Sequence, residues 1–416
     1  MNYIWFFLLL IALVTGMVTG AVDQVSKAAL DSAGTAVNIS LGLIGVMTLW
    51  LGIMKIAHEA GLVTLLARAI KPVSRRLFPD IPEDHPAIGA MVLNISANWL
   101  GLSNAATPMG LKAMQELQSL NPDKDTASDS MIMFLALNTG SITLIPMTVI
   151  AARAVLKSAD PAEIIGATIF ASTCATIAGV LAAKFYINLQ RGFRSLLHRL
   201  AAAWKTAAAV VVMGLAAMVL VRSGVFTQPV SWLPQGVFRK AVETLSRWAI
   251  PFLLLMIPVY GCFKKVKVYE VFIEGAKEGF QVAVRIIPFL VAILAVIGMF
   301  RASGAMDYFV LLLTPLTDLI GMPAEVLPAA LMRPLSGSGS LGIITELMQT
   351  HGPDSFIGRM ASTIYGCSET TFYVVAVYFG SVQIKNTRGA IPVGLTADAA
   401  GILAAVLICR ILFLQA

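Results

Sequence analysis

Two stretches of polar and glycine residues interrupt sequence that is otherwise apolar enough for a membrane interior. Residues 94–108 contain three asparagines, and residues 333–342 contain an arginine followed by alternating serines and glycines. Asparagine amides donate and accept hydrogen bonds without carrying charge, so they suit a neutral or zwitterionic solute or a sodium ion. Serine and glycine N–H groups at a helix start attract carboxylate or phosphate. The stretches therefore predict contacts with a small polar solute; capping of broken helix ends and a plain glycine turn are the alternative roles.

Two carboxylates lie inside apolar segments. Glu369 is near the middle of residues 360–382, among hydroxyl side chains, and Asp398 is in residues 390–413. A carboxylate in a membrane helix costs at least about 2.5 kcal/mol and is by default a functional candidate. Either carboxylate could carry a coupling proton or hold sodium, or could instead pair with an arginine to hold helices together. The candidate arginines for such a pair are Arg285, Arg333 and Arg359.

Hydroxyl and amide side chains at matching places in the two halves complete the predicted site. Interhelical packing, worth about 0.6 kcal/mol per hydrogen bond in a membrane, is the alternative role for the hydroxyls of the first half. The predicted solute-binding residues are Asn94, Asn98, Ser103, Asn104, Thr107, Asn138, Thr139, Ser141, Arg333, Ser336, Ser338, Ser340, Ser368, Glu369, Thr370 and Thr371. The predicted ion-coupling residues are Glu369 and Asp398.

Composition indicates an integral membrane protein whose surroundings are the lipid bilayer. Apolar residues make up 57% of the 416 residues and charged residues only 13%, against about 25% charged residues in a soluble domain. The formal net charge of +7 comes from basic residues between apolar segments, which is a membrane orientation signal and not a nucleic-acid surface.

Motifs for catalysis or metal binding are not apparent in the sequence. The four cysteines and four histidines are scattered, without metal-ligand spacing, and neither a nucleophile–base motif nor a phosphate loop is present. We therefore expect no enzyme activity, no protein-built metal site and no cofactor, with sodium or protons as the coupling ions.

Hydropathy predicts an all-α polytopic membrane protein, since a spanning helix needs about 20 mostly apolar residues. The expected spans are 3–22, 37–56, 131–152, 163–187, 205–222, 247–263, 281–300, 360–382 and 390–413. Residues 86–113 and 324–349 have apolar flanks too short to span alone on either side of the polar stretches. We interpret both as re-entrant hairpins or interrupted helices, because irregular backbone survives in a membrane only inside protein or beside water.

Basic residues indicate the orientation, because Lys and Arg concentrate on the cytoplasmic side. With a cytoplasmic N-terminus, and with each hairpin returning to the side it entered from, all four basic clusters fall in the cytoplasm. These clusters are Arg68/Lys71/Arg75/Arg76, Lys184/Arg191/Arg194/Arg199/Lys205, Lys264/Lys265/Lys267 and Lys385/Arg388. Residues 37–56 then run inward and residues 281–300 outward, so we expect two inverted repeats in a bacterial inner membrane.

The two repeats align by order and spacing. Gly61 corresponds to Gly304 and Pro72 to Pro315. The polar stretches follow, then residues 138–141 with 367–371, and finally residues 173–179 with 396–401. Each repeat would read helix, hairpin, helix, helix. Inverted repeats can open one central site alternately to either side of a membrane.

Longer runs of sequence resemble two known families. Residues 1 to about 190 resemble spore maturation protein A, and residues from about 245 to 416 resemble spore maturation protein B, so the chain looks like a fused form. The runs that carry the first resemblance are 49–55, 84–86 and 104–114. The runs that carry the second are 274–279, 333–341, 351–355 and 369–374.

The resemblance implies a membrane "gate" or nucleoside-recognition domain in each half, similar to parts of concentrative nucleoside transporters and of the ferrous-iron transport protein B. It implies a transport-like core but no particular substrate. Iron transport is not expected, because Cys367 is the cysteine near the polar centre and the others lie elsewhere in the sequence.

Together these observations predict an ion-coupled secondary transporter of a small polar organic solute, either nucleoside-like or an organic anion. Its halves would be residues 1–190 and 246–416, joined by residues 191–245. A membrane scaffold that supports envelope or cell-wall assembly and moves nothing is the alternative, and a channel is a third hypothesis. Self-association into a homo-oligomer stays open.

Overall fold

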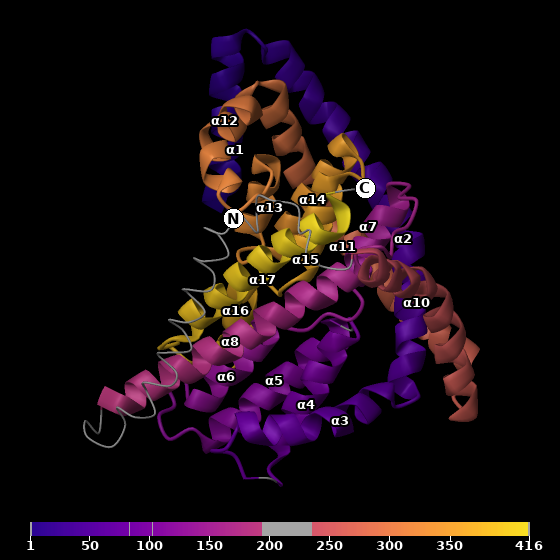
Figure 1. The fold of residues 1–416 in the computed structure, drawn as a ribbon, viewed down its shortest axis with the longest axis vertical. Coiled ribbons are helices and arrows are strands. Elements are labelled where there is room, and N and C mark those ends of the chain that lie inside the picture. Colours follow the sequence, from indigo (N-terminus) through magenta and orange to yellow (C-terminus); the bar gives the residue numbers. More distant parts are fainter. Residues whose placement is uncertain (1, 83, 102, 194–234, 415–416) are drawn as a thin grey trace.

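The computed structural model describes residues 2–414 except 83, 102 and 194–234, and these residues are almost entirely helical (Figure 1). The first half contains α1 (Asn2–Thr19), α2 (Val22–Glu59), α3 (Leu62–Leu77), α4 (Pro86–Trp99), α5 (Ser103–Leu120), α6 (Asp129–Thr139), α7 (Met147–Val155) and α8 (Ile165–Phe193). The second half contains α10 (Gln235–Phe263), α11 (Val268–Ala302), α12 (Ala305–Asp318), a 3₁₀ turn η1 (Ala324–Val326), α13 (Leu327–Met332), α14 (Gly337–His351), α15 (Phe356–Gly366), α16 (Thr371–Ser381) and α17 (Ala390–Phe413).

The protein is an all-α polytopic membrane protein, as predicted. Among the described residues, the four helices α2, α8, α11 and α17 are long and apolar enough to cross a membrane. Shorter apolar helices occur within α1, α10 and α12. The 38 residues of α2 extend about 57 Å along its axis, well beyond a hydrocarbon core of about 30 Å. The predicted span 205–222 lies outside the described residues.

Two of the expected spans, 131–152 and 360–382, are not continuous helices, so this part of the prediction is wrong. The first is divided into α6 and α7 by residues 140–146, and the second into α15 and α16 by residues 367–370. Pro146 immediately precedes α7, and proline disfavours helical geometry in the residue before it. Apolar residues flank both breaks closely, so hydropathy alone predicts one continuous helix in each place.

The two polar stretches recognised in the sequence do interrupt helices. The first separates α4 from α5, which pack against each other as a hairpin, and Gly101 in the turn adopts a left-handed φ of 72°. The second separates the six-residue α13 from α14. Glycine suits the first turn because a side chain there would strain the backbone.

Helices α2 and α11 pack along their lengths in opposite directions. A Cβ atom at Gly279 would lie 2.6 Å from the carbonyl oxygen of Met47, and one at Gly298 would meet Ser32. Glycines therefore let the two backbones approach closely, as in many membrane helix pairs. Each helix ends in a left-handed glycine, after which α3 lies at the lower end of the molecule and α12 at the upper end (Figure 1).

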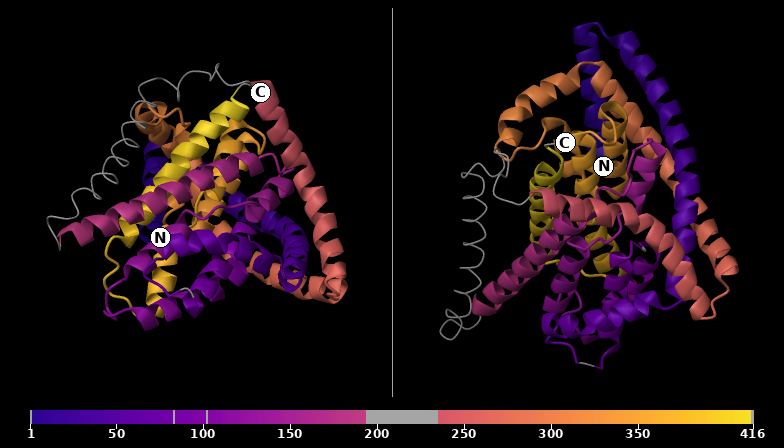
Figure 2. Two further views of the ribbon diagram at one scale, coloured as in Figure 1. Left: turned by 60° about the horizontal axis from the view of Figure 1, so that its bottom comes forward. Right: turned by 45° about the vertical axis from the view of Figure 1, so that its right-hand side comes forward.

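Both divided helices contact helices of the other half of the chain. In the main buried apolar cluster, Ala152 of α7 packs with Met360 of α15. In a second cluster, Phe379 of α16 packs with Phe134 of α6. The second divided helix thus ends against α5 and α6 of the first half, whereas α7 packs mainly on α2 of its own half and also contacts α14 and α15. Helices α8 and α17 lie side by side between them (Figure 2).

Candidate functional site

The two helix breaks meet between α8 and α17. The N–H of Glu369, in the second break, donates to the carbonyl oxygen of Thr139 at the end of α6, at 2.7 Å. The hydroxyl of Thr176 on α8 donates to the carbonyl oxygen of Gly140. On the other side, the hydroxyl of Thr371 donates to the Asp398 carboxylate on α17 at 2.6 Å. Both interruptions therefore share one place in the molecule, which we call the crossing.

Buried oxygens gather at the crossing. Asp398 is 1% exposed, and Thr139, Ser368 and Thr371 are equally well buried. A Cβ atom at Gly394 would lie 2.9 Å from the Thr371 hydroxyl oxygen and 3.4 Å from that of Thr139, so both hydroxyls border the same spot. The Ser368 hydroxyl faces the Asp398 carboxylate.

Several of these oxygens are not satisfied by the protein. The hydroxyls of Thr139 and Ser368 and one carboxylate oxygen of Asp398 make no well-formed hydrogen bond within the described part of the chain. An unsatisfied buried polar group costs about 1–3 kcal/mol, so several in one place call for a functional explanation. A bound cation could take all three oxygens as ligands, whereas a proton on the carboxylate would satisfy only Asp398 and the Ser368 hydroxyl that faces it.

Glu369 occupies the second break itself and not a helix interior. Its side chain is 42% exposed, unlike its buried neighbours, and its carboxylate lies 3.6 Å from the Arg333 guanidinium. The ion pair with an arginine, which the sequence offered as the alternative role of Glu369, is therefore formed with Arg333. Arg359 pairs instead with Glu163 at 2.9 Å.

Arg333 holds the second break in place. It is buried, its guanidinium lies over the Tyr365 ring at 4.4 Å, and it donates to the Ser368 carbonyl oxygen and to the Thr370 hydroxyl. The Phe372 N–H donates to the carbonyl oxygen of Pro334 at 3.1 Å. These contacts bring the N-termini of α14 and α16 together.

The serines that follow Arg333 have different surroundings. Ser336 caps α14, because its hydroxyl accepts from the N–H of Gly339 at 3.0 Å. Ser338 is half-buried. Ser340 is fully buried, and its hydroxyl has no hydrogen-bond partner among the described residues. Capping was predicted as an alternative role for the asparagines of the first stretch and not for Ser336, which nevertheless has this role.

Three of the predicted amides belong to one hydrogen-bond network that includes Tyr378. Asn94 donates to the carbonyl oxygen of Ala106 at 2.7 Å and to the Tyr378 hydroxyl at 3.0 Å. Asn138 accepts from Asn98 at 3.0 Å and from Tyr378 at 3.2 Å. Tyr378 on α16 was not among the predicted residues, because a tyrosine in an apolar run has no distinguishing sequence signal. This network ties the hairpin to both divided helices.

The remaining predicted residues lie close to these groups in the chain. Ser141 is buried in the first break, where its carbonyl oxygen accepts from the Thr143 hydroxyl at 3.3 Å. Thr107 is half-buried on α5 and engaged with other residues. Ser103 and Asn104 begin α5, and their side chains lie outside the described residues. Solute binding by the whole set stays a prediction.

The oxygens at the crossing are the kind that could hold sodium. Within the described ranges, no three His, Cys, Asp or Glu side chains lie together. The crossing instead offers hydroxyls, backbone carbonyls at helix breaks and one carboxylate, and unwound carbonyls are the usual sodium ligands in transporters with broken helices.

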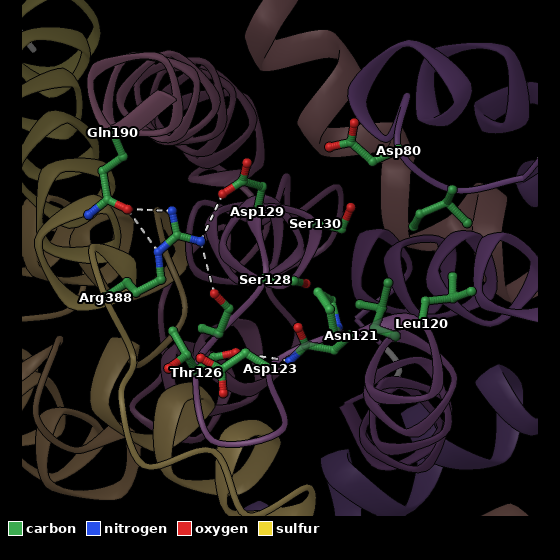
Figure 3. A pocket seen from close by; sticks show the side chains of 14 residues that line it. Asp80, Leu120, Asn121, Asp123, Thr126, Ser128, Asp129, Ser130, Gln190 and Arg388 are labelled. Carbon is green, nitrogen blue, oxygen red and sulfur yellow. Dashed lines mark hydrogen bonds and ion pairs between the residues drawn. The ribbon is translucent and has the colours of Figure 1, made fainter. Parts of the chain in front are cut away.

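A cavity of about 760 Å³ lies away from the crossing, between the α5–α6 loop, the end of α8 and the start of α17 (Figure 3). Asn121, Thr126 and Ser128 line it, with Gln190 and Arg388 on its far side. None of the predicted solute-binding residues belongs to its lining. The cavity is therefore an opening at one end of the molecule, separate from the crossing.

The order of elements and the crossed breaks define a helical membrane protein with one divided helix in each half. The chain belongs to the Gate family, described as "Nucleoside recognition", whose model matches residues 40–155 and 283–385. The first matched segment ends at the last residue of α7 and the second ends beyond α16, so each includes one of the breaks that meet at the crossing.

Two curated proteins of Bacillus subtilis are similar to this chain. Spore maturation protein B is 49% identical over 172 residues, which are 41% of this chain and 97% of that protein. Spore maturation protein A is 45% identical over 185 residues, 44% of this chain and 94% of that protein. The predicted resemblance to a fusion of these two families is confirmed. No solved structure matches the chain.

Proposed function

We propose that the protein is a secondary transporter that moves a small polar organic solute across the bacterial inner membrane, coupled to sodium or protons. The observation that carries this proposal is the crossing, where one divided helix from each half meets its counterpart around Asp398. Paired helix breaks with buried polar groups are the best structural pointer to a transporter's binding site.

Inverted repeats are part of the proposal, and the geometry supports them. Helices α2 and α11 are antiparallel, with α3 and α12 at opposite ends of the molecule (Figure 1). The divided helices also end alike, at Lys157 with φ 61° and at Gln383 with φ 59°. In both cases the next N–H bonds back five residues, Ser158 to Arg153 and Ile384 to Phe379, each at 3.0 Å. Such left-handed caps end helices in a defined direction.

We infer an organic anion or a nucleoside-like molecule as the solute. Arg333 and the converging N-termini of α14 and α16 favour a negative group, and the exposed Glu369 is the acid that such a group would displace from Arg333. The description of the Gate family supports a nucleoside-like solute. Asp398 with its hydroxyl neighbours is the proposed ion site.

The orientation follows from the basic residues. Lys55 at the end of α2 lies beside the start of α11, so the Lys264–Lys267 loop and α3 share one end of the molecule, which we propose is cytoplasmic. Helix α2 then runs inward and α1 outward, so the N-terminus is cytoplasmic.

Thermal unfolding of the purified protein against nucleosides, dicarboxylates and amino acids, with and without sodium, tests the proposal. A bound solute at 100 times its Kd should stabilise the folded state by about 2.7 kcal/mol. Asp398→Asn should remove the sodium or pH dependence of that stabilisation, and Glu369→Gln should weaken solute binding. Glu270→Gln is the matched control, because Glu270 is exposed and pairs with the exposed Lys267.

Vesicles containing the protein distinguish the alternatives. A carrier should concentrate the stabilising solute against its gradient when a sodium or proton gradient is applied, whereas a channel would only equilibrate it. If no solute class shifts unfolding, no flux occurs and cells tolerate Asp398→Asn, the transporter is rejected in favour of the scaffold.

A further inference from the structure

A buried arginine of the first half holds a loop of the second half. Arg153, near the end of α7, is 0% exposed and donates to the Pro353 carbonyl oxygen and, at 2.9 Å, to the Asp354 carboxylate. The same carboxylate accepts from the Ser158 hydroxyl at 2.6 Å and from the Ala159 N–H at 2.8 Å. We call this group the Arg153 clasp.

The Arg153 clasp lies at one end of the α8–α17 pair. Glu163, just before α8, is 3.5 Å from Arg153 and 2.9 Å from Arg359. The Arg359 guanidinium in turn lies over the Phe413 ring at the end of α17, at 5.0 Å. Buried charges in such a group depend on one another, because removing one leaves its partner without compensation.

An arginine of the second half holds a loop of the first half in the same way. Arg388, just before α17, donates to the Ala127 carbonyl oxygen at 2.9 Å and to the Asp129 carboxylate at 2.8 Å. It also donates to the Gln190 side chain near the end of α8, at 2.9 Å (Figure 3). We call this group the Arg388 clasp.

The two clasps are reciprocal. Arg153 lies in the last turn of α7 and Arg388 in the loop after α16, and each bonds to a backbone carbonyl and an aspartate at or just before the start of the other divided helix. Helices α8 and α17 are antiparallel, because Glu163 and Phe413 approach Arg359 at one end while Gln190 and Arg388 meet at the other. The clasps therefore lie at opposite ends, with the crossing between them.

The two clasps differ in how tightly they are closed. Arg153 is wholly buried and its partner Asp354 is 34% exposed, whereas Arg388 and Asp129 are 18% and 19% exposed. Beside the Arg388 clasp, Lys385 and Asp125 form an ion pair that is largely exposed, and the cavity of about 760 Å³ opens there. The Arg388 end is thus open to a cavity, whereas the arginine of the other clasp has no contact with solvent.

We propose that the two clasps are the alternating gates of this protein, so that loosening one favours closure of the other. The inference rests on the transporter proposed above. Each clasp is joined to the crossing by half of a divided helix, α7 for Arg153 and α16 for the loop that carries Arg388. A shift of either half-helix therefore reaches both the crossing and a clasp, which is the two-state element that alternating access needs.

Hydrogen–deuterium exchange of the full-length protein, without any solute, tests the coupling. In Arg153→Gln, amides of residues 352–358 should exchange at least about tenfold faster, because the Pro353 carbonyl oxygen and the Asp354 carboxylate lose their donor, which favours local opening. Amides of residues 121–128 and 382–389 should exchange about fivefold slower, the size expected of typical allosteric coupling. Arg388→Gln should produce the opposite pattern, with faster exchange at residues 121–128 and 382–389 and slower exchange at residues 352–358. Because Arg388 is partly exposed, this variant should fold even if Arg153→Gln does not.

Arg301→Gln is the matched control, since Arg301 pairs with Glu346 at 2.7 Å within the second half and belongs to neither clasp. It should change exchange at neither clasp. If breaking one clasp leaves the other unchanged or loosens it as well, the clasps only stabilise the fold and the inference is overturned. Because no solute is present, this result is separate from the ligand screen: a solute could bind without reciprocal gates, or the gates could be reciprocal with no solute found.

Discussion

At the scale of single residues, the Tyr378 hydroxyl joins the halves. It accepts from Asn94 of the hairpin and donates to Asn138 at the first break, and its ring stacks on Phe134 with centroids 5.7 Å apart. The amides were recognisable in the sequence as polar groups in apolar surroundings. Their mutual bonding was not, because the residue that connects them comes from a helix 240 residues later.

Tyr378→Phe should destabilise the protein by about 1–3 kcal/mol, because two buried amides lose a partner while the ring is kept. Thermal unfolding in detergent measures this change. Tyr373→Phe is the control, since Tyr373 on the same helix is 57% exposed, and it should unfold like the parent. Equal unfolding of both variants would show that the network contributes nothing to stability.

At the scale of elements, the break between α6 and α7 depends on close contact with α8. A Cβ atom at Gly140 would lie 2.8 Å from the backbone of Ala175 and Thr176, and backbone cannot move aside as a flexible side chain can. The sequence marked residues 138–141 as polar, but a continuous helix fitted the same apolar flanks. Packing against α8 selects the interrupted form.

Gly140→Ala should therefore lower the thermal stability of the folded protein, because the added methyl group forces α6 away from α8. Gly45→Ala is the matched substitution: nothing lies within 4 Å of its Cβ position in α2, and alanine favours a helix over glycine by about 1 kcal/mol. Unfolding temperatures should fall for the first variant and hold or rise for the second. A parent-like Gly140→Ala protein would contradict the close contact.

At the scale of the whole molecule, α3 and α12 should face opposite sides of the membrane. Arg68 on α3 and Asp307 on α12 are both exposed, and inverted repeats place these helices on different surfaces. The charge difference agrees with this placement, since α3 carries basic residues and the first turn of α12 is acidic.

Labelling with a membrane-impermeant maleimide measures this placement. In a Cys262→Ser background, which removes an exposed cysteine, Asp307→Cys should react in intact cells whose outer surface is accessible. Arg68→Cys should react only after the membrane is permeabilised, because basic residues place α3 on the side proposed to be cytoplasmic. Reaction of both positions from the same side would exclude inverted repeats.

The sequence alone determined the class of protein, the two polar interruptions and the family, because composition, helix length and local motifs are properties of neighbouring residues. It also identified Asp398 and Glu369, since a carboxylate in an apolar run is conspicuous without any fold. The division of residues 131–152 and 360–382, the Tyr378 network and the paired arginines depended on tertiary structure. The Tyr378 network and the paired arginines arise from contacts between segments about 200 or more residues apart, and the first break also needs α8 beside it. The physical reason is that a helix break is stable only where another helix supplies the missing partners.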